Sequence, residues 1–280
     1  MEFLDAHLIP IVNGFAYGLL LFTVAAGLTL AFGVADVLNL AHGAIYVAGG
    51  YAAVVITDGT WTSLILAVLA GAAVGAAAGG LLSAAVAPLE GRGHLVQALF
   101  TFGMALAAGS GLVALFGAEE LRPTLPPALA ESVSILGKSY SAYRLSFIVI
   151  ASLLAVAGWL IVSRTQAGAR VRATVDDRDM VACLGTSPRA VMSGVLAVAG
   201  LLAGMAGALG APIIGPGPGA AEHVLMLSLI IVVVGRLGSI GGAFVAAIFV
   251  GQMQSLGVVL FRDVAPYLLF GAMAVALLLQ

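Results

Sequence analysis

The feature that most constrains this chain is a series of long apolar runs separated by short polar or glycine-rich stretches. Most of these runs contain about 20 residues, the length an α-helix needs to cross the hydrocarbon core of a bilayer. A transmembrane barrel would instead require alternating strands of about ten residues. The sequence therefore predicts an all-α integral membrane protein with runs at 8–32, 37–57, 62–87, 95–117, 145–163, 189–211, 222–235, 243–260 and 264–280.

The composition supports lipid as the solvent. Of the 280 residues, 62% are hydrophobic and only 9% are charged, whereas a soluble domain has about a quarter charged residues. The net charge of -2 shows no basic excess, so a nucleic-acid partner is not expected. The single cysteine, Cys183, excludes an internal disulfide. We expect one transmembrane domain over 1–280, a polytopic bundle of about 8–10 helices without a soluble domain.

Two places in the apolar pattern predict broken or re-entrant helices. Residues 8–57 are about ten residues too many for two spans of about 20, and the surplus falls on GVADVLNLAHG at 33–43. The run 222–235 is the weakest of the expected crossings, because it is short and follows the proline-rich stretch 212–219, and a broken or re-entrant helix is favoured there over a full span. Irregular backbone at membrane depth must be shielded by protein or line an aqueous cavity. We therefore expect a solute path near Asn39, His42, Gly43, Gly215, Gly217 and Glu222.

An alternative interpretation of Asn39 and His42 has equal weight. Polar side chains inside a membrane protein also bond neighbouring helices. No second histidine or cysteine stands at metal-ligand spacing from His42, so we expect no metal site.

The distribution of basic residues predicts the orientation. Cytoplasmic loops carry an excess of Lys and Arg, and five of the eleven basic residues lie in 163–191. Placing that segment inside puts the N-terminus outside, the C-terminus inside and the longest loop, about 118–144, on the outer face. Nine crossings satisfy this arrangement. The start has no basic residue before the first apolar run, so that run is expected to stay in the mature protein.

The segment 163–191, SRTQAGARVRATVDDRDMVACLGTSPRAV, predicts a short surface helix over about 177–184. Asp176 is the expected N-cap and Gly185 the expected C-terminal stop. Ser187 and Pro188 then begin the next membrane helix. A plain arginine-rich loop is the competing interpretation, but it leaves the capping residues unexplained.

Glycines recur at helix-packing spacing in two places, GAAVGAAAG (71–79) and GLLAGMAG (200–207). Small residues allow close approach of helices in a membrane, so we expect packing and no chemistry there. The stretch SILGKSY (134–140) contains Gly-Lys-Ser but has Ser132 where a phosphate-binding loop needs glycine. We therefore expect no ATPase activity from this chain.

Three blocks resemble the permease subunits of ABC importers for branched-chain amino acids, in order and spacing across nearly the whole chain. They are GLTLAFGVADVLNLAHGAIYVAGGYAA (27–53), the segment 163–191 and VVVGRLGSIGGAFVAAIFVG (232–251). The chain departs from the family pattern at Val175-Asp176-Asp177 and at Arg236, which leaves its partner and substrate open.

The resemblance implies a multi-pass subunit of the bacterial inner membrane that forms the path for branched-chain amino acids or a related small solute, such as an amide, urea or an aromatic acid. It implies a second homologous permease subunit, cytoplasmic ATPase subunits that bind ATP and Mg, and an extracytoplasmic solute-binding protein. This chain itself would bind no cofactor and be no enzyme. The segment about 164–190 would couple it to the ATPase through Arg172, Asp176, Asp177, Arg178, Met180, Val181, Leu184 and Gly185.

A second function class stays open. An ion- or proton-coupled secondary transporter or channel would use Asp36, His42 or Glu222 as relay groups, because ionisable residues inside a membrane commonly mark ion pathways. A pH gradient would then drive transport without ATP.

Overall fold

The computed structural model describes residues 2–260 except 90 and 136, together with residues 267, 271 and 274. The predicted run at 264–280 therefore lies outside the described residues, those three positions aside. The apolar helices are α1 (Glu2–Leu30), α2 (His42–Ile56), α3 (Trp61–Val86), α4 (His94–Phe116), α6 (Ala142–Arg164), α9 (Pro188–Gly210), α10 (Ala220–Val234) and α11 (Ile240–Leu260). The all-α prediction is confirmed.

Within the described residues, six helical segments are long and apolar enough to cross a membrane, by length and composition. Two others, α2 and α10, have only 15 residues each. At 1.5 Å per residue such a helix is about 22 Å long, short of the roughly 30 Å hydrocarbon core. Both short helices follow the interruptions that the sequence predicts. The eight apolar helices of the described residues fall within the expected range of 8–10.

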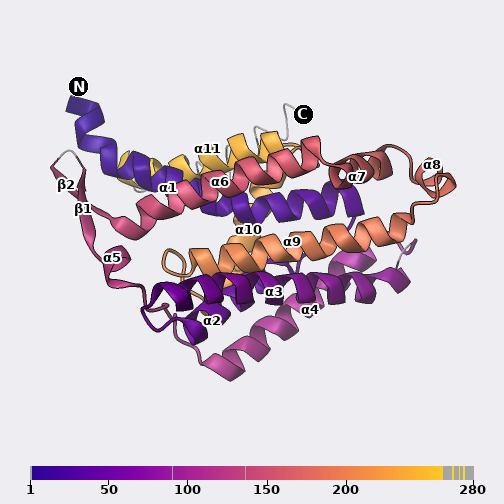
Figure 1. The fold of residues 1–280 in the computed structure, drawn as a ribbon, viewed down its shortest axis with the longest axis horizontal. Helices are drawn as coiled ribbons and strands as arrows, with labels where there is room; N and C mark the ends of the chain where they lie inside the picture. Colours follow the sequence, from indigo (N-terminus) through magenta and orange to yellow (C-terminus); the bar gives the residue numbers. More distant parts are fainter. Residues whose placement is uncertain are drawn as a thin grey trace.

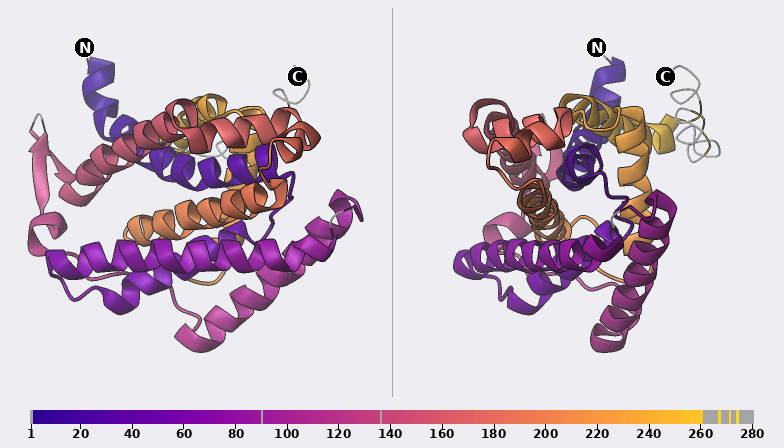
Figure 2. Two further views of the ribbon diagram at one scale, coloured as in Figure 1. Left: turned by 45° about the vertical axis from the view of Figure 1, so that its right-hand side comes forward. Right: turned by 90° about the vertical axis from the view of Figure 1, so that its right-hand side faces the viewer.

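The long helices lie side by side along the long axis of the molecule (Figure 1). The arginine-rich segment, which contains α7 (Gln166–Asp176) and α8 (Arg178–Cys183), lies at one end. The start of α1, α5 (Pro127–Ala130) and a β-hairpin lie at the other. Helix α4 diverges from the remaining bundle (Figure 2). The positive-inside rule predicts that the α7–α8 end is the cytoplasmic one.

The two glycine rows pack against each other. A Cβ on Gly75 would overlap the carbonyl oxygen of Gly200, and a Cβ on Gly204 would overlap that of Gly71. Helices α3 and α9 therefore approach with their backbones in direct contact, as small residues allow in membrane proteins. The predicted packing role is confirmed, and the structure adds that Gly200 and Gly204 face the α3 row, whereas Gly207 packs against the Tyr46 carbonyl of α2.

The loop predicted at about 118–144 contains a hairpin that sequence analysis did not predict. Strands β1 (Ser132–Ile135) and β2 (Lys138–Ser141) pair antiparallel. Gly137, which has a φ of 78°, lies in the turn, so the Gly-Lys-Ser stretch at 137–139 is part of a hairpin. Tyr140 Oη and Arg144 Nη1 both donate hydrogen bonds to Oδ1 of Asn13 in α1, at 3.2 and 2.6 Å. These bonds attach the hairpin and the start of α6 to α1.

Candidate functional site

The first interruption lies between α1 and α2. Helix α1 continues into a π-helix, η1 (Ala31–Ala35), which ends at Asp36 with a left-handed φ of 55°. The following irregular backbone is bonded by α4, since Thr101 Oγ1 accepts from the Leu40 N–H at 3.1 Å and donates to the Leu38 carbonyl at 2.8 Å. Asn39 Oδ1 accepts from the Ala41 N–H at 3.0 Å. Side chains of the protein thus form hydrogen bonds with the irregular backbone, as a helix break inside a membrane requires.

Of the three predicted path residues of this region, His42 and Gly43 lie where α1, α2 and α10 meet, and Asn39 lies in the break before α2. Asn39 and His42 are buried. The Nε2–H group of His42 donates to the carbonyl of Val24 at 2.9 Å, and its Nδ1 has no partner among the described residues. Gly43 lies against the carbonyl of Ala221 in α10. Their contact with a solute stays a prediction, and the His42–Val24 bond shows that His42 also joins two helices.

The second interruption separates α9 from α10. The Leu121 N–H of the outer loop donates to the Pro216 carbonyl at 3.0 Å, and Gly215 lies against the Leu121 carbonyl. Gly219, with a φ of 78°, precedes α10 and provides no side-chain cap. The first helical N–H, that of Ala220, donates to Gly217 at 3.2 Å. The next two amides, of residues 221 and 222, have no acceptor among the described residues.

An outer cavity of about 420 Å³ borders this open helix end. Gly217 and Glu222, both predicted path residues, line it together with Tyr51 of α2 and Ser110 of α4. The Tyr51 ring stacks on Phe116 with centroids 4.3 Å apart, and its hydroxyl is buried without a partner among the described residues. Asn39, His42, Gly43 and Gly215 do not line this cavity.

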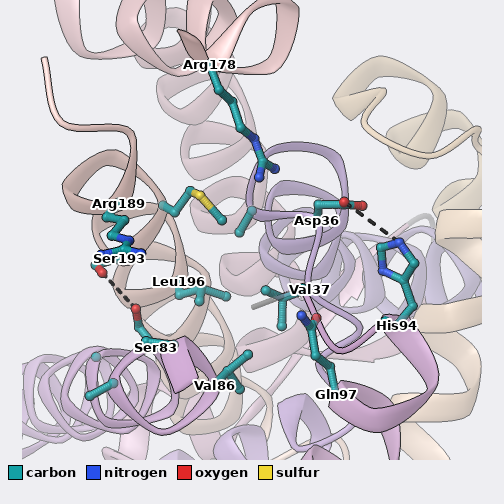
Figure 3. A pocket seen from close by; sticks show the side chains of 17 residues that line it. Asp36, Val37, Ser83, Val86, His94, Gln97, Arg178, Arg189, Ser193 and Leu196 are labelled. Atoms are coloured by element: carbon teal, nitrogen blue, oxygen red, sulfur yellow. Dashed lines mark hydrogen bonds and ion pairs between the residues drawn. The ribbon is translucent and has the colours of Figure 1, made fainter. Parts of the chain in front are cut away.

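A second cavity of about 520 Å³, called the inner cavity below, lies beside α8 and the start of α9 (Figure 3). Figure 3 shows Arg178 extending from α8 toward Asp36, whose Oδ2 lies 3.9 Å from Nε2 of His94. Gln97 of α4 also lines the cavity, and its Oε1 is buried without a partner among the described residues. Sequence analysis missed His94 and Gln97, although polar side chains within or beside apolar runs are the signal that could have found them.

The structure corrects the predicted cap of the coupling helix. Asp177, not Asp176, is the N-cap of α8, and its carboxylate accepts from the Met180 N–H at 2.9 Å. Asp176 is the last residue of α7, a helix that sequence analysis did not predict. The expected start of α9 is confirmed, since Ser187 caps it and Pro188 follows in its first turn.

The predicted stop at Gly185 is confirmed. Gly185 has a φ of 81°, and its N–H donates to the Ala182 carbonyl at 3.0 Å. The Thr186 N–H donates to the Val181 carbonyl at 3.2 Å. These two bonds form a Schellman motif, the usual helix end at a left-handed glycine.

The coupling segment has an outward and an inward face. Met180 and Leu184, one helical turn apart, are 59% and 77% exposed. Val181 is turned inward and buried. Arg172 donates to the Val162 carbonyl at the end of α6, and α7 packs against both η1 and α9. A partner that binds the exposed side of α8 would therefore transmit its movement through α7 to η1, where the first interruption begins.

Among the described residues, no three His, Cys, Asp or Glu side chains gather in a group that could hold a metal ion.

Comparison with known proteins adds an independent finding. The profile of the family described as branched-chain amino acid transport system, permease component, matches residues 10–278. The high-affinity branched-chain amino acid transport system permease protein BraD of Pseudomonas aeruginosa is 27% identical over 273 residues, covering 92% of this chain and 88% of the relative. The permease proteins LivH of Salmonella typhimurium and Escherichia coli are each 27% identical over 261 residues, covering 87% of this chain and 83% of each relative. No solved structure gives a significant match.

Proposed function

Because the chain belongs to the family of branched-chain amino acid transport system permease components, we propose that it is the transmembrane subunit of an ABC importer for branched-chain amino acids or a related small solute. Members of this family are transport subunits and not enzymes. With six candidate spans in the part of the chain that the structure describes, the chain is a multi-pass protein of the bacterial inner membrane. Its role is to provide the path for the solute.

The observation that supports the proposal most directly is the position of the α7–α8 segment. Its short, capped helix exposes Met180 and Leu184 at the arginine-rich end, where a soluble ATPase can reach them. Its other side packs on η1 and α9, so a movement of α8 would reach the break at 36–41. The predicted ATPase contacts Arg172, Asp176, Asp177, Arg178 and Gly185 belong to the same segment.

The proposed complex contains a homologous second permease subunit, cytoplasmic ATPase subunits and an extracytoplasmic solute-binding protein. ATP and Mg bind to the ATPase subunits, and this chain supplies no cofactor site. The broad exposed apolar surface of α4, α6 and α11, which includes Phe100, Leu153 and Phe249, contacts lipid and the second permease. Such a surface is expected of a membrane subunit removed from its bilayer.

Reconstitution of the assembled complex in proteoliposomes tests this function. Uptake of tritiated leucine should require both the binding protein and internal ATP, and the isolated chain should hydrolyse no ATP. A panel of tritiated amides, urea and aromatic acids identifies the solute. Uptake driven by a pH gradient in the absence of ATP would favour the secondary transporter and contradict the proposal.

A further inference from the structure

We propose that Arg178 of α8 exchanges with His94 of α4 as the partner of the Asp36 carboxylate, and that this exchange opens and closes the wall of the inner cavity. The inference rests on the proposed function, because it states how α8 acts on the solute path. It gives Arg178 a role inside this chain, in place of the contact with the ATPase that the sequence predicts.

Asp36 and His94 lie between two cavities. Both residues line the inner cavity and also a third cavity, of about 600 Å³, which is bounded by Phe32 of η1 and by Leu229 and Val232 of α10. No other described residue belongs to both linings. The two side chains therefore form part of the wall between these cavities. Separation of Asp36 from His94 would join the two spaces beside the first interruption.

The contact between Asp36 and His94 is weak. Oδ2 of Asp36 lies 3.9 Å from Nε2 of His94, which is longer than a hydrogen bond. The two side chains are 64% and 68% exposed, and ion pairs in such solvated positions contribute little to stability. The carboxylate can therefore change its partner at a small cost in free energy.

Arg178 is the alternative partner. Figure 3 shows its side chain extending from α8 toward Asp36, and its guanidinium has no hydrogen bond or ion pair among the described residues. A guanidinium can donate two parallel, charge-assisted hydrogen bonds to a carboxylate, which makes arginine a stronger partner than this distant histidine. The stronger partner is thus present without being engaged, so a shift of α8 would decide which pair forms.

The faces of α8 set the direction of that shift. Arg178 precedes Val181 by three residues, so the two share the inward face of the helix. Met180 and Leu184 lie on the exposed side. A partner that presses on Met180 and Leu184 would therefore carry Arg178 toward Asp36.

The backbone at Asp36 also suits a change of conformation. Asp36 ends η1 with a φ of 55°, a left-handed conformation that is uncommon for residues other than glycine. Thr101 holds the nearby backbone at Leu38 and Leu40, so Asp36 connects η1 to a fixed segment. Residues in such strained conformations are often found in switch regions.

Cross-linking in the assembled complex measures the two distances, in a Cys183→Ser background. One variant carries Asp36→Cys with His94→Cys and another carries Asp36→Cys with Arg178→Cys, and a short bifunctional thiol reagent joins each pair. The two cross-links should be favoured in opposite nucleotide states, with ATP bound and without nucleotide. A cross-link between positions 36 and 178 that forms equally in both states, or in neither, would overturn the inference.

A charge swap tests the ion pair in proteoliposomes. Arg178→Asp should reduce ATP-driven uptake of tritiated leucine by about fivefold or more, the lower range of coupling between sites. Adding Asp36→Arg to this variant should restore uptake, because the pair is then reversed and complete. Arg170→Asp, at an exposed arginine of α7 that lines neither cavity, is the matched control and should leave uptake unchanged. Failure of Asp36→Arg to restore uptake would contradict the pair.

Arg178→Gln separates the remaining outcomes. The native side chain is exposed and unpaired among the described residues, so this variant should fold and assemble. Unchanged uptake by Arg178→Gln defeats the partner exchange. Loss of the ATPase on co-purification would show that Arg178 contacts the ATPase, and it defeats the exchange as well. Absence of ATP-driven uptake by the unsubstituted complex defeats instead the proposed function.

Discussion

Gly43 of α2 packs against the backbone carbonyl of Ala221 in α10, so the two short helices meet at their first turns. Both helices begin after an interruption, the first at 36–41 and the second at 211–219. A single glycine therefore sets how closely the two breaks approach.

Replacement of Gly43 by valine should destabilise the protein. A Cβ at this position overlaps the Ala221 carbonyl, and overpacking a tight contact costs about 1–3 kcal/mol. Gly103→Val in α4, where nothing lies within 4 Å of an added Cβ, controls for the change in helix propensity. Thermal unfolding of the purified variants in detergent measures the difference, and equal midpoints would contradict the close approach.

The two neighbouring aspartates of the coupling segment should behave differently. Asp177→Ala removes the cap of α8 and should cost about 1 kcal/mol of local stability, which corresponds to a roughly fivefold faster amide exchange in α8. Asp176→Ala removes no cap and serves as the matched control. Hydrogen exchange over α8 distinguishes the two variants. A larger effect of Asp176→Ala would contradict Asp177 as the cap and favour Asp176, the residue predicted from the sequence.

Charged substitutions on the outward face of α8 should weaken ATPase binding. Met180→Asp and Leu184→Asp place a charge on the exposed apolar pair, while Val133→Asp does so on the hairpin at the opposite end. Co-purification of the ATPase should fall several-fold for the first two only, because charged residues are depleted from interface cores. Unchanged recovery for both would show that α8 does not contact the ATPase.

Cysteines at positions 39 and 42, in a Cys183→Ser background, test the path at the first interruption. Both native residues are buried in this structure, so reaction with a small aqueous thiol reagent should be slow in the corresponding state. If the path opens here, the reaction should accelerate when ATP is bound to the complex. Protection in every nucleotide state would mean that Asn39 and His42 serve only to join helices.

The outer turn before α3 should be sensitive to acid. Hydrogen bonds from Ser63 and Thr60 lower the pKa of Asp58 from its usual value near 3.8 to about 2. Because the folded pKa is depressed, this contribution to stability is complete above pH 4 and is lost as the pH falls toward 2. Fluorescence of Trp61 in a Trp159→Phe variant reports the change. Asp58→Asn should remove this pH dependence, and an unaltered titration would exclude Asp58 as its source.

Several features of the fold could be predicted from the sequence because they are local. Apolar run length predicts spans, and a surplus or deficit of residues predicts the breaks before α2 and α10. The end at Gly185 and the start at Ser187-Pro188 depend only on adjacent residues, since a left-handed glycine and a serine cap act within one helical turn. For the same reason the glycine rows could be assigned to helix packing before their partners were known.

Other features depended on tertiary contacts and could not be predicted. Helix α7 has no long apolar stripe, and it packs against η1 and α9. Because α7 ends at Asp176, the next residue, Asp177, is the one that caps α8. The support of the 36–41 backbone by Thr101 joins residues about 60 positions apart. The outer cavity likewise needs α2, α4 and α10 together. The sequence alone determined which stretches form apolar helices and where α8 ends and α9 begins, because hydropathy and capping are properties of neighbouring residues. The tertiary structure alone decided which helix ends face each other, because close packing depends on residues that the chain brings together only when it folds.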